Sequence, residues 1–212
     1  MDLSTPGGPD SLVEAADRLA FEPNVLVNSA GFGVLGAFAE EPLERQLAMI
    51  RLNVLVLVAL TGAYVPRMIR RADGVVVNVA STAALQPLPY MAAYAASKAF
   101  MLSFGEALWA ETRKAGVHTV TVCPGPVSTP FHESGGNPTD VRLQRRRGYV
   151  STDAVVAATF AALEADRPRA VVRVPGGWSR LYAASTKVSL FVPRRWAMLA
   201  SERLSRWMFP RS

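Results

Sequence analysis

The segment that decides the fold is residues 74–98, GVVVNVASTAALQPLPYMAAYAASK. Its first eight residues (74–81) are mostly β-branched and apolar, and they predict a buried strand. The residues that follow Met91 are rich in Ala, Leu and Met, with no glycine before Gly105, so a long helix is expected over 91–115. A buried strand leading into such a helix is typical of an α/β sheet.

The same alternation extends to both sides of this segment. Strands are predicted at 24–28 (NVLVN), 118–122 and 170–174. Helices are predicted at 10–20, from Pro42 through the apolar region 52–64 with Pro66 near its end, near 140–147, and at 152–165. Strands that alternate with helices predict a parallel α/β sheet in a single domain.

The composition fits an ordinary globular domain, with 212 residues of which 50% are hydrophobic and 19% charged. A single cysteine, Cys123, excludes an internal disulfide. Together with His118 and His132 it forms no cluster at metal-ligand spacing, so no metal site is predicted. No targeting segment is visible, and a reduced cytoplasmic setting is expected. The apolar run 52–66 is shorter than the roughly 20 residues of a membrane-spanning helix and is interpreted as a core helix.

The net charge of +6 is concentrated near the C-terminus. Residues 178–212 carry one acid, Glu202, and seven basic side chains: Arg180, Lys187, Arg194, Arg195, Arg203, Arg206 and Arg211. Because the rest of the chain is neutral, nucleic-acid binding is not expected. The basic stretch bears tryptophans and predicts amphipathic helices. Peripheral membrane contact and a lid or subunit contact are the alternatives for it.

The clearest chemical motif is the pair Tyr94 and Lys98 on the predicted long helix. At spacing i, i+4 the two side chains share one face of the helix. An ammonium beside a phenol favours the phenolate, so the Tyr94 pKa is expected below its usual value of about 10. Ser81 ends the preceding strand at the sheet edge where α/β proteins bind ligands. Tyr94 is therefore a candidate general acid/base, and Ser81 a candidate donor to a substrate oxygen.

Further elements give this set of residues a family resemblance. The segment NSAG, 28–31, resembles an Asn-Asn-Ala-Gly element with Ser29 in place of the second Asn. Asn53 falls within the next helix, and PGPVST, 124–129, resembles a Pro-Gly turn that ends in a threonine. Ser81, Tyr94 and Lys98 lie in that order between Asn53 and the Pro-Gly turn. With this set of elements the chain resembles the short-chain dehydrogenase/reductase family from Asp2 to Thr129.

The resemblance implies a Rossmann-like doubly wound parallel sheet and hydride transfer between a nicotinamide cofactor and an alcohol or ketone. It implies that Tyr94 moves the proton, that Lys98 lowers the Tyr94 pKa and binds the nicotinamide ribose, that Ser81 orients the substrate, and that Asn53 supports a water in the proton relay. The implied cofactor contacts are Asp2, Leu3, Asn28, Ala30, Gly31, Tyr94, Lys98, Pro124, Gly125, Val127 and Thr129. NADP is favoured over NAD, and the 91–115 helix is expected to form a homo-oligomer.

The nearby apolar side chains suggest a small hydrophobic alcohol or ketone as substrate, with contacts from Leu85, Leu88 and Phe131. Each polar candidate also has a plainer explanation when taken alone. Asn53 is then a buried polar residue bonded to neighbouring backbone, Ser81 a residue that forms a turn, and Thr129 an ordinary loop residue before Pro130. The spacing of these residues relative to Tyr94 and Lys98 is what favours a shared active site over the separate explanations.

The family's Gly-rich cofactor-phosphate turn is missing from the sequence. Gly31, Gly33 and Gly36 spell G-x-G-x-x-G but do not open a helix at once, as that turn requires. We therefore expect residues 1–177 to be a partial domain without its first three strands, followed by the 178–212 tail. Strand 24–28 would then be an apolar edge, giving poor solubility and weak dinucleotide binding. The alternative to an enzyme is an inactive remnant that acts through dimerisation or membrane association.

Overall fold

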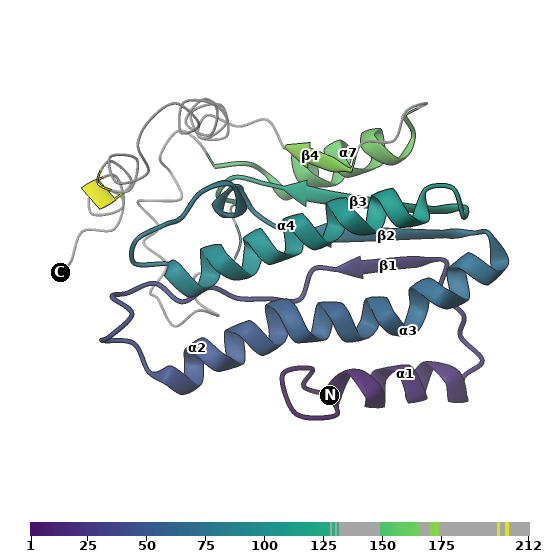
Figure 1. Ribbon diagram of the computed structural model, residues 1–212, viewed down its shortest axis with the longest axis horizontal. Helices are drawn as coiled ribbons and strands as arrows, with labels where there is room; N and C mark the ends of the chain where they lie inside the picture. The colour runs from purple at the N-terminus through teal and green to yellow at the C-terminus, as the bar shows by residue number, and fades with distance from the viewer. Residues whose placement is uncertain are drawn as a thin grey trace.

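Four parallel strands form the sheet, in the order β1-β2-β3-β4 (Figure 1). They are β1 Val25–Asn28, β2 Gly74–Val79, β3 Val117–Cys123 and β4 Val171–Arg173. The register aligns Asn28 with Asn78 and Asn78 with Thr121. The predicted parallel α/β fold is confirmed, with strand limits within two residues of those expected.

The computed structural model describes residues 1–127, 129, 131, 149–165, 170–173, 199 and 202–203. Its helices are α1 Gly8–Arg18, α2 Leu43–Ile50, the π-helical turn η1 Arg51–Leu55, α3 Val56–Arg71, the 3-10 turn η2 Thr82–Leu85, α4 Ala92–Thr112 and α7 Thr152–Leu163. The helix predicted near 140–147 and the amphipathic tail 178–212, apart from Leu199, Glu202 and Arg203, lie outside the described residues.

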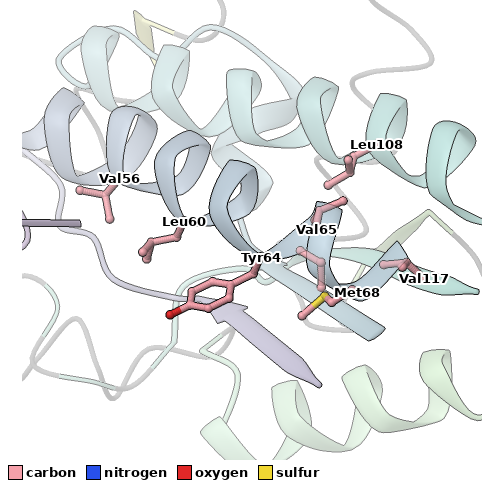
Figure 2. Packing of buried hydrophobic residues seen from close by; sticks show 8 residues of the cluster. Val56, Leu60, Tyr64, Val65, Met68, Leu108 and Val117 are labelled. Carbon is pink, nitrogen blue, oxygen red and sulfur yellow. The ribbon is translucent and has the colours of Figure 1, made fainter. Parts of the chain in front are cut away.

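Helices cover both faces of the sheet because successive strand side chains point to opposite sides. On one face Val76 packs with side chains of α3 and α4, such as Tyr64, Met68 and Leu108 (Figure 2). On the other face Val77 packs in a cluster that includes Val155 of α7. The sheet is therefore doubly wound, as predicted.

The helix that runs from Leu43 to Arg71 differs in two ways from the prediction. Pro42 is its N-cap rather than its first residue, and the helix passes through Pro66 to Arg71. Pro66 is tolerated because it lies on the exposed face, where the carbonyl of Gly62 that loses its amide partner faces solvent. In the part of the chain that the structure describes, this is the one helix long and apolar enough to cross a membrane. Its inner face packs on the sheet, as expected for a core helix.

The first helix begins two residues earlier than the sequence suggested. Gly7, with φ of 77°, is the N-cap of α1, and Pro9 lies in the first turn. Proline suits this position because the first backbone N–H groups of a helix have no partner within it. The helix then lies against α3, where an ion pair joins Arg67 to Asp17.

Strand β1 pairs only with β2 among the described residues. Leu26 packs toward α3, whereas Val25 and Val27 point to the opposite face and are 54% and 55% exposed. An open strand edge that carries exposed valines is a template for association with other strands.

Candidate active site

The turn after β2 brings Ser81 to the start of α4. Ser81 is the N-cap of η2, and its Oγ accepts a hydrogen bond from the backbone amide of Ala83 at 3.1 Å. The short η2 turn then returns the chain to the sheet edge, and Tyr94 lies in the first turn of α4. The Ser81 side chain lies close enough to the Tyr94 hydroxyl to act on its pKa. The two residues thus meet as the spacing suggested.

The phenol of Tyr94 lies in an apolar setting. Its side chain is buried among Val34, Leu88 and Met91, and the Phe131 ring lies 5.7 Å away between centroids. Burial raises the Tyr94 pKa to about 12, and the nearby Ser81 side chain opposes part of that rise. The expectation of a pKa below 10 is therefore wrong for this structure, because desolvation of the phenolate outweighs any help from a neighbouring charge.

Lys98 lies one turn further along α4, but its ammonium is bound elsewhere. Its Nζ donates to the carbonyl oxygen of Val79, at the end of β2, over 2.9 Å, and lies 5.9 Å from the centroid of the Tyr94 ring. Burial lowers the Lys98 pKa to about 8, while Cys123 acts in the opposite direction. At pH 7 the charged form of Lys98 is still the main one.

Asn53 lies in the π-helical turn between α2 and α3 and is fully buried. Its Nδ2 donates to the carbonyl of Phe32 at 3.1 Å and to Ser97 Oγ at 3.0 Å, while its Oδ1 accepts from the Phe32 amide at 3.2 Å. A π-helical turn inside a long helix is frequent at functional sites. Here it places an amide side chain against the loop that follows β1.

Gly31 in that loop lies close to both Asn53 and Lys98. A Cβ at this position would lie 2.6 Å from Asn53 Oδ1 and 3.8 Å from Lys98 Nζ. Only glycine allows so close an approach without moving Asn53. The backbone of Gly31 therefore forms one wall of the same site.

Asn28 has a structural environment. Its Nδ2 donates to Asn78 Oδ1 at 2.9 Å and to Thr61 Oγ1 at 3.3 Å, and all three residues are buried. Its Nδ2 group therefore links β1 to β2 and to α3.

The Pro-Gly loop lies beside η2. The carbonyl of Pro124 accepts from the Thr82 amide at 2.8 Å, and the carbonyl of Val127 accepts from the Thr129 amide at 2.9 Å. A Cβ at Gly125 would meet only Val150, at an ordinary 3.9 Å. The loop thus runs along the carboxyl edge of the sheet, next to Ser81.

The remaining candidates divide into two groups. Leu88 and Phe131 pack in the cluster that holds Tyr94, and Leu85 ends the η2 turn, half-buried. Leu3 instead packs in the α1–α3 cluster, and the Asp2 carboxylate accepts hydrogen bonds from the amide and hydroxyl of Ser4. Asp2 and Leu3 are therefore not joined to the group around Tyr94.

Comparison with known proteins now decides the family. A sequence model of the short chain dehydrogenases matches residues 1–138. The chain belongs to the short-chain dehydrogenase family. The probable oxidoreductase EphD of Mycobacterium tuberculosis is 36% identical over 149 residues, which are 65% of this chain and 25% of that protein. The ketoacyl reductase HetN of a Nostoc species is 34% identical over 118 residues, 56% of this chain and 41% of that one.

Solved structures of the family share the fold. A short-chain dehydrogenase from Streptomyces avermitilis has a TM-score of 0.76 at 24% identity, with 97% of this chain and 78% of that one covered. A second, from Sphingobium yanoikuyae in complex with NADPH, has a TM-score of 0.72 at 26% identity and coverages of 91% and 74%. The chain spans only a quarter to about half of the length of the curated relatives that it matches.

Two features of this short-chain dehydrogenase site were not predicted. Ser97 bonds to Asn53, and Cys123 lies near enough to Lys98 to influence its pKa. The bonds of Asn53 to the backbone of Phe32 agree with the plainer explanation of a buried polar residue bonded to neighbouring backbone. Ser97 stands inside the Tyr94–Lys98 motif, which was the available signal. Nothing in the sequence marks the π-helical turn, because residues 51–55 contain neither Gly nor Pro.

Proposed function

We propose that this protein is an NAD(P)-dependent oxidoreductase that transfers hydride between a nicotinamide and an alcohol or ketone, with Tyr94 as its acid/base. The observation that carries the proposal is the meeting of Tyr94, Ser81, Lys98 and Asn53 at the carboxyl ends of β1 and β2. These groups come from three separate segments of the chain. A purely structural serine or asparagine would not require this convergence.

The residues present fit a nicotinamide nucleotide on the sheet edge. Lys98 uses one donor on Val79, and an ammonium has three, so it can bind a ribose hydroxyl without losing that contact. Gly31 presents backbone rather than a side chain, and the 124–129 loop offers backbone groups for a carboxamide. The bound cofactor supplies or accepts the hydride. We propose NADP ahead of NAD because the Sphingobium relative was solved with NADPH.

The protonation state of Tyr94 favours one direction of the reaction. With a pKa of about 12, the phenol is neutral at pH 7 and can donate its proton to a carbonyl oxygen that is being reduced. Ser81, which lies beside Tyr94, would donate its own proton to the same oxygen and hold it in place. Alcohol oxidation requires the phenolate, so it is expected to need higher pH.

The substrate pocket is proposed to be apolar. Leu88 and Phe131 pack around Tyr94, and Leu85 follows Ser81 by four residues. Such walls favour a small hydrophobic ketone or alcohol over a charged one, because a charge placed there loses its hydration. The Pro-Gly loop supplies the remaining backbone contacts.

A homo-oligomer through α4 is also proposed. Phe100 on this helix is 41% exposed and stacks on Phe104, with ring centroids 5.9 Å apart. Leu55 and Val58, on the neighbouring helix, are 58% and 40% exposed. A second copy would cover these side chains. Sedimentation of Phe100→Glu beside the wild type tests the interface: a shift to monomer supports it, and an unchanged mass rejects it.

The activity is tested on the full product of the gene, with its start fixed by N-terminal sequencing of the native protein. NADPH consumption is followed with a panel of small apolar ketones at pH 7. Turnover that requires Tyr94 supports the oxidoreductase. Binding and turnover that are both undetectable in a folded protein favour the alternative of an inactive, dimerising family member.

A further inference from the structure

Gly33 lies where two aromatic rings of the site meet. It belongs to the loop that follows β1 and is buried. A Cβ at this position would be 3.1 Å from Cε1 and 3.2 Å from Cζ of Phe131, and 3.3 Å from Cδ2 of Tyr94. These separations are shorter than an ordinary van der Waals contact, so a side chain here would press on both rings. The backbone of Gly33 therefore packs directly against them.

The absence of a side chain at Gly33 matters for space and not for backbone conformation. Among the described residues, the glycines with a positive φ are Gly7, Gly36 and Gly116. Because Gly33 is not one of them, an alanine there would meet no penalty from a left-handed backbone. What a side chain would displace is the ring of Phe131, which comes from the loop beyond β3.

The Phe131 ring forms a wall next to the phenol of Tyr94. The two ring centroids are 5.7 Å apart and their planes are inclined at 57°, a tilted arrangement that aromatic pairs favour. Leu88 and Val34 pack in the same cluster. A carbonyl oxygen that reaches the Tyr94 hydroxyl has to bring its two carbon substituents along these walls. One of the two then lies on the side that Phe131 occupies.

We propose that Gly33 is a specificity-determining residue for the substrate. By giving the Phe131 ring its place against Tyr94, it narrows one side of the pocket, so that the enzyme reduces ketones in which one substituent is as small as methyl. This role of Gly33 rests on the proposed oxidoreductase function. The apolar walls select an uncharged substrate, and Gly33 adds a limit on how much of that substrate fits beside Tyr94.

The packing is tested first without activity, by proton NMR of the folded wild type. The α-hydrogen of Gly33 that points to the rings should show nuclear Overhauser contacts with ring hydrogens of both Phe131 and Tyr94. The ring current of Phe131 should also shift its resonance, and Phe131→Ala should reduce that shift. If the wild type, which needs no variant to fold, shows neither contact, Gly33 does not seat the ring and its role is overturned.

The specificity is tested on the full gene product with two isomeric substrates, methyl pentyl ketone and dipropyl ketone. They contain the same atoms, so they differ in the size of the smaller substituent. The wild type should prefer the methyl ketone in kcat/KM by at least about tenfold, because the propyl group adds two methylenes on the narrow side. Phe131→Ala should bring the two values close to equality. Adding Gly33→Val should recover part of the preference, since its methyl groups fill space that the ring has left.

The matched control is Phe160→Ala, at an exposed position on α7, which should keep the wild-type preference. A wild type that is active but takes both isomers equally would overturn the role of Gly33 and leave the proposed function standing. An unchanged preference in an active Phe131→Ala variant would overturn that role as well. A wild type that reduces neither ketone contradicts the proposed function, and the role of Gly33 in specificity falls with it.

Discussion

The ammonium of Lys98 lies 2.9 Å from the carbonyl oxygen of Val79 and donates to it, rather than to the hydroxyl of Tyr94 one turn away. The lysine is thereby fixed to the end of β2. Its burial lowers its pKa to about 8, and the burial of Tyr94 raises the pKa of the phenol to about 12. Both pKa shifts favour the neutral form of the side chain, and this affects the stability of the protein as well as catalysis.

Replacing Lys98 with methionine should stabilise the protein at neutral pH. The pKa falls from 10.5 in the unfolded chain to about 8 in the fold, so the buried charge opposes folding at pH 7. A shift of this size corresponds to about 3 kcal/mol, and loss of the Val79 hydrogen bond offsets about 1. Urea unfolding of Lys98→Met should therefore show a gain of about 2 kcal/mol at pH 7.

The stability gained by Lys98→Met should depend on pH between the two pKa values of Lys98, about 8 in the fold and 10.5 in the unfolded chain. Wild-type stability falls as pH drops from 10.5 to 8, because the unfolded chain takes up the proton first. The advantage of Lys98→Met should therefore shrink as pH rises from 8 toward 10.5. An equal or lower stability of the variant at pH 7 would show that Lys98 is not desolvated.

Ser81→Ala separates a catalytic serine from a turn former. Loss of the N-cap bond to Ala83 should cost about 1 kcal/mol of unfolding free energy. Loss of the hydroxyl beside Tyr94 should lower kcat about 100-fold. Ser81→Thr keeps the hydroxyl and should retain both. If only stability falls in Ser81→Ala, Ser81 is a cap and nothing more.

Gly31→Ala should disturb the site from the loop side. The added methyl would lie 2.6 Å from Asn53 Oδ1, so either the loop or Asn53 has to move. A cost of about 1–3 kcal/mol is expected in thermal unfolding. Gly62→Ala is the matched control: it lies on an exposed helix face with nothing within 4 Å and should stabilise by up to about 1 kcal/mol. Equal behaviour of the two would refute the close contact.

The edge of β1, which has no partner strand other than β2 among the described residues, should promote association of the protein. Val27→Lys places a charge on a strand edge where the valine is 55% exposed. Light scattering during concentration should show less aggregation than in the wild type. Leu199→Lys, at an exposed apolar position outside the four strands, should have no such effect. Equal scattering from all three proteins would show that β1 is not the cause.

The sequence was a good guide to the elements because their patterns are local. The valines of residues 74–79 and the alanine-rich run 92–112 each specify one structure through their own spacing. Charge environments depend on distant residues instead. The Tyr94 pKa was predicted in the wrong direction because Phe131 and Leu88, which bury the phenol, come from separate segments. The partners of Asn53, Phe32 and Ser97, are set by tertiary packing as well.

The central claim is that Tyr94 supplies the proton for ketone reduction. Its most direct test is the single-turnover rate of NADPH oxidation with a small apolar ketone, measured for wild type and Tyr94→Phe over pH 6–9. The phenylalanine keeps the ring packed on Phe131 and removes only the hydroxyl. We predict a rate at least about 100-fold lower at every pH, with NADPH affinity unchanged. A Tyr94→Phe rate close to that of the wild type would contradict the account.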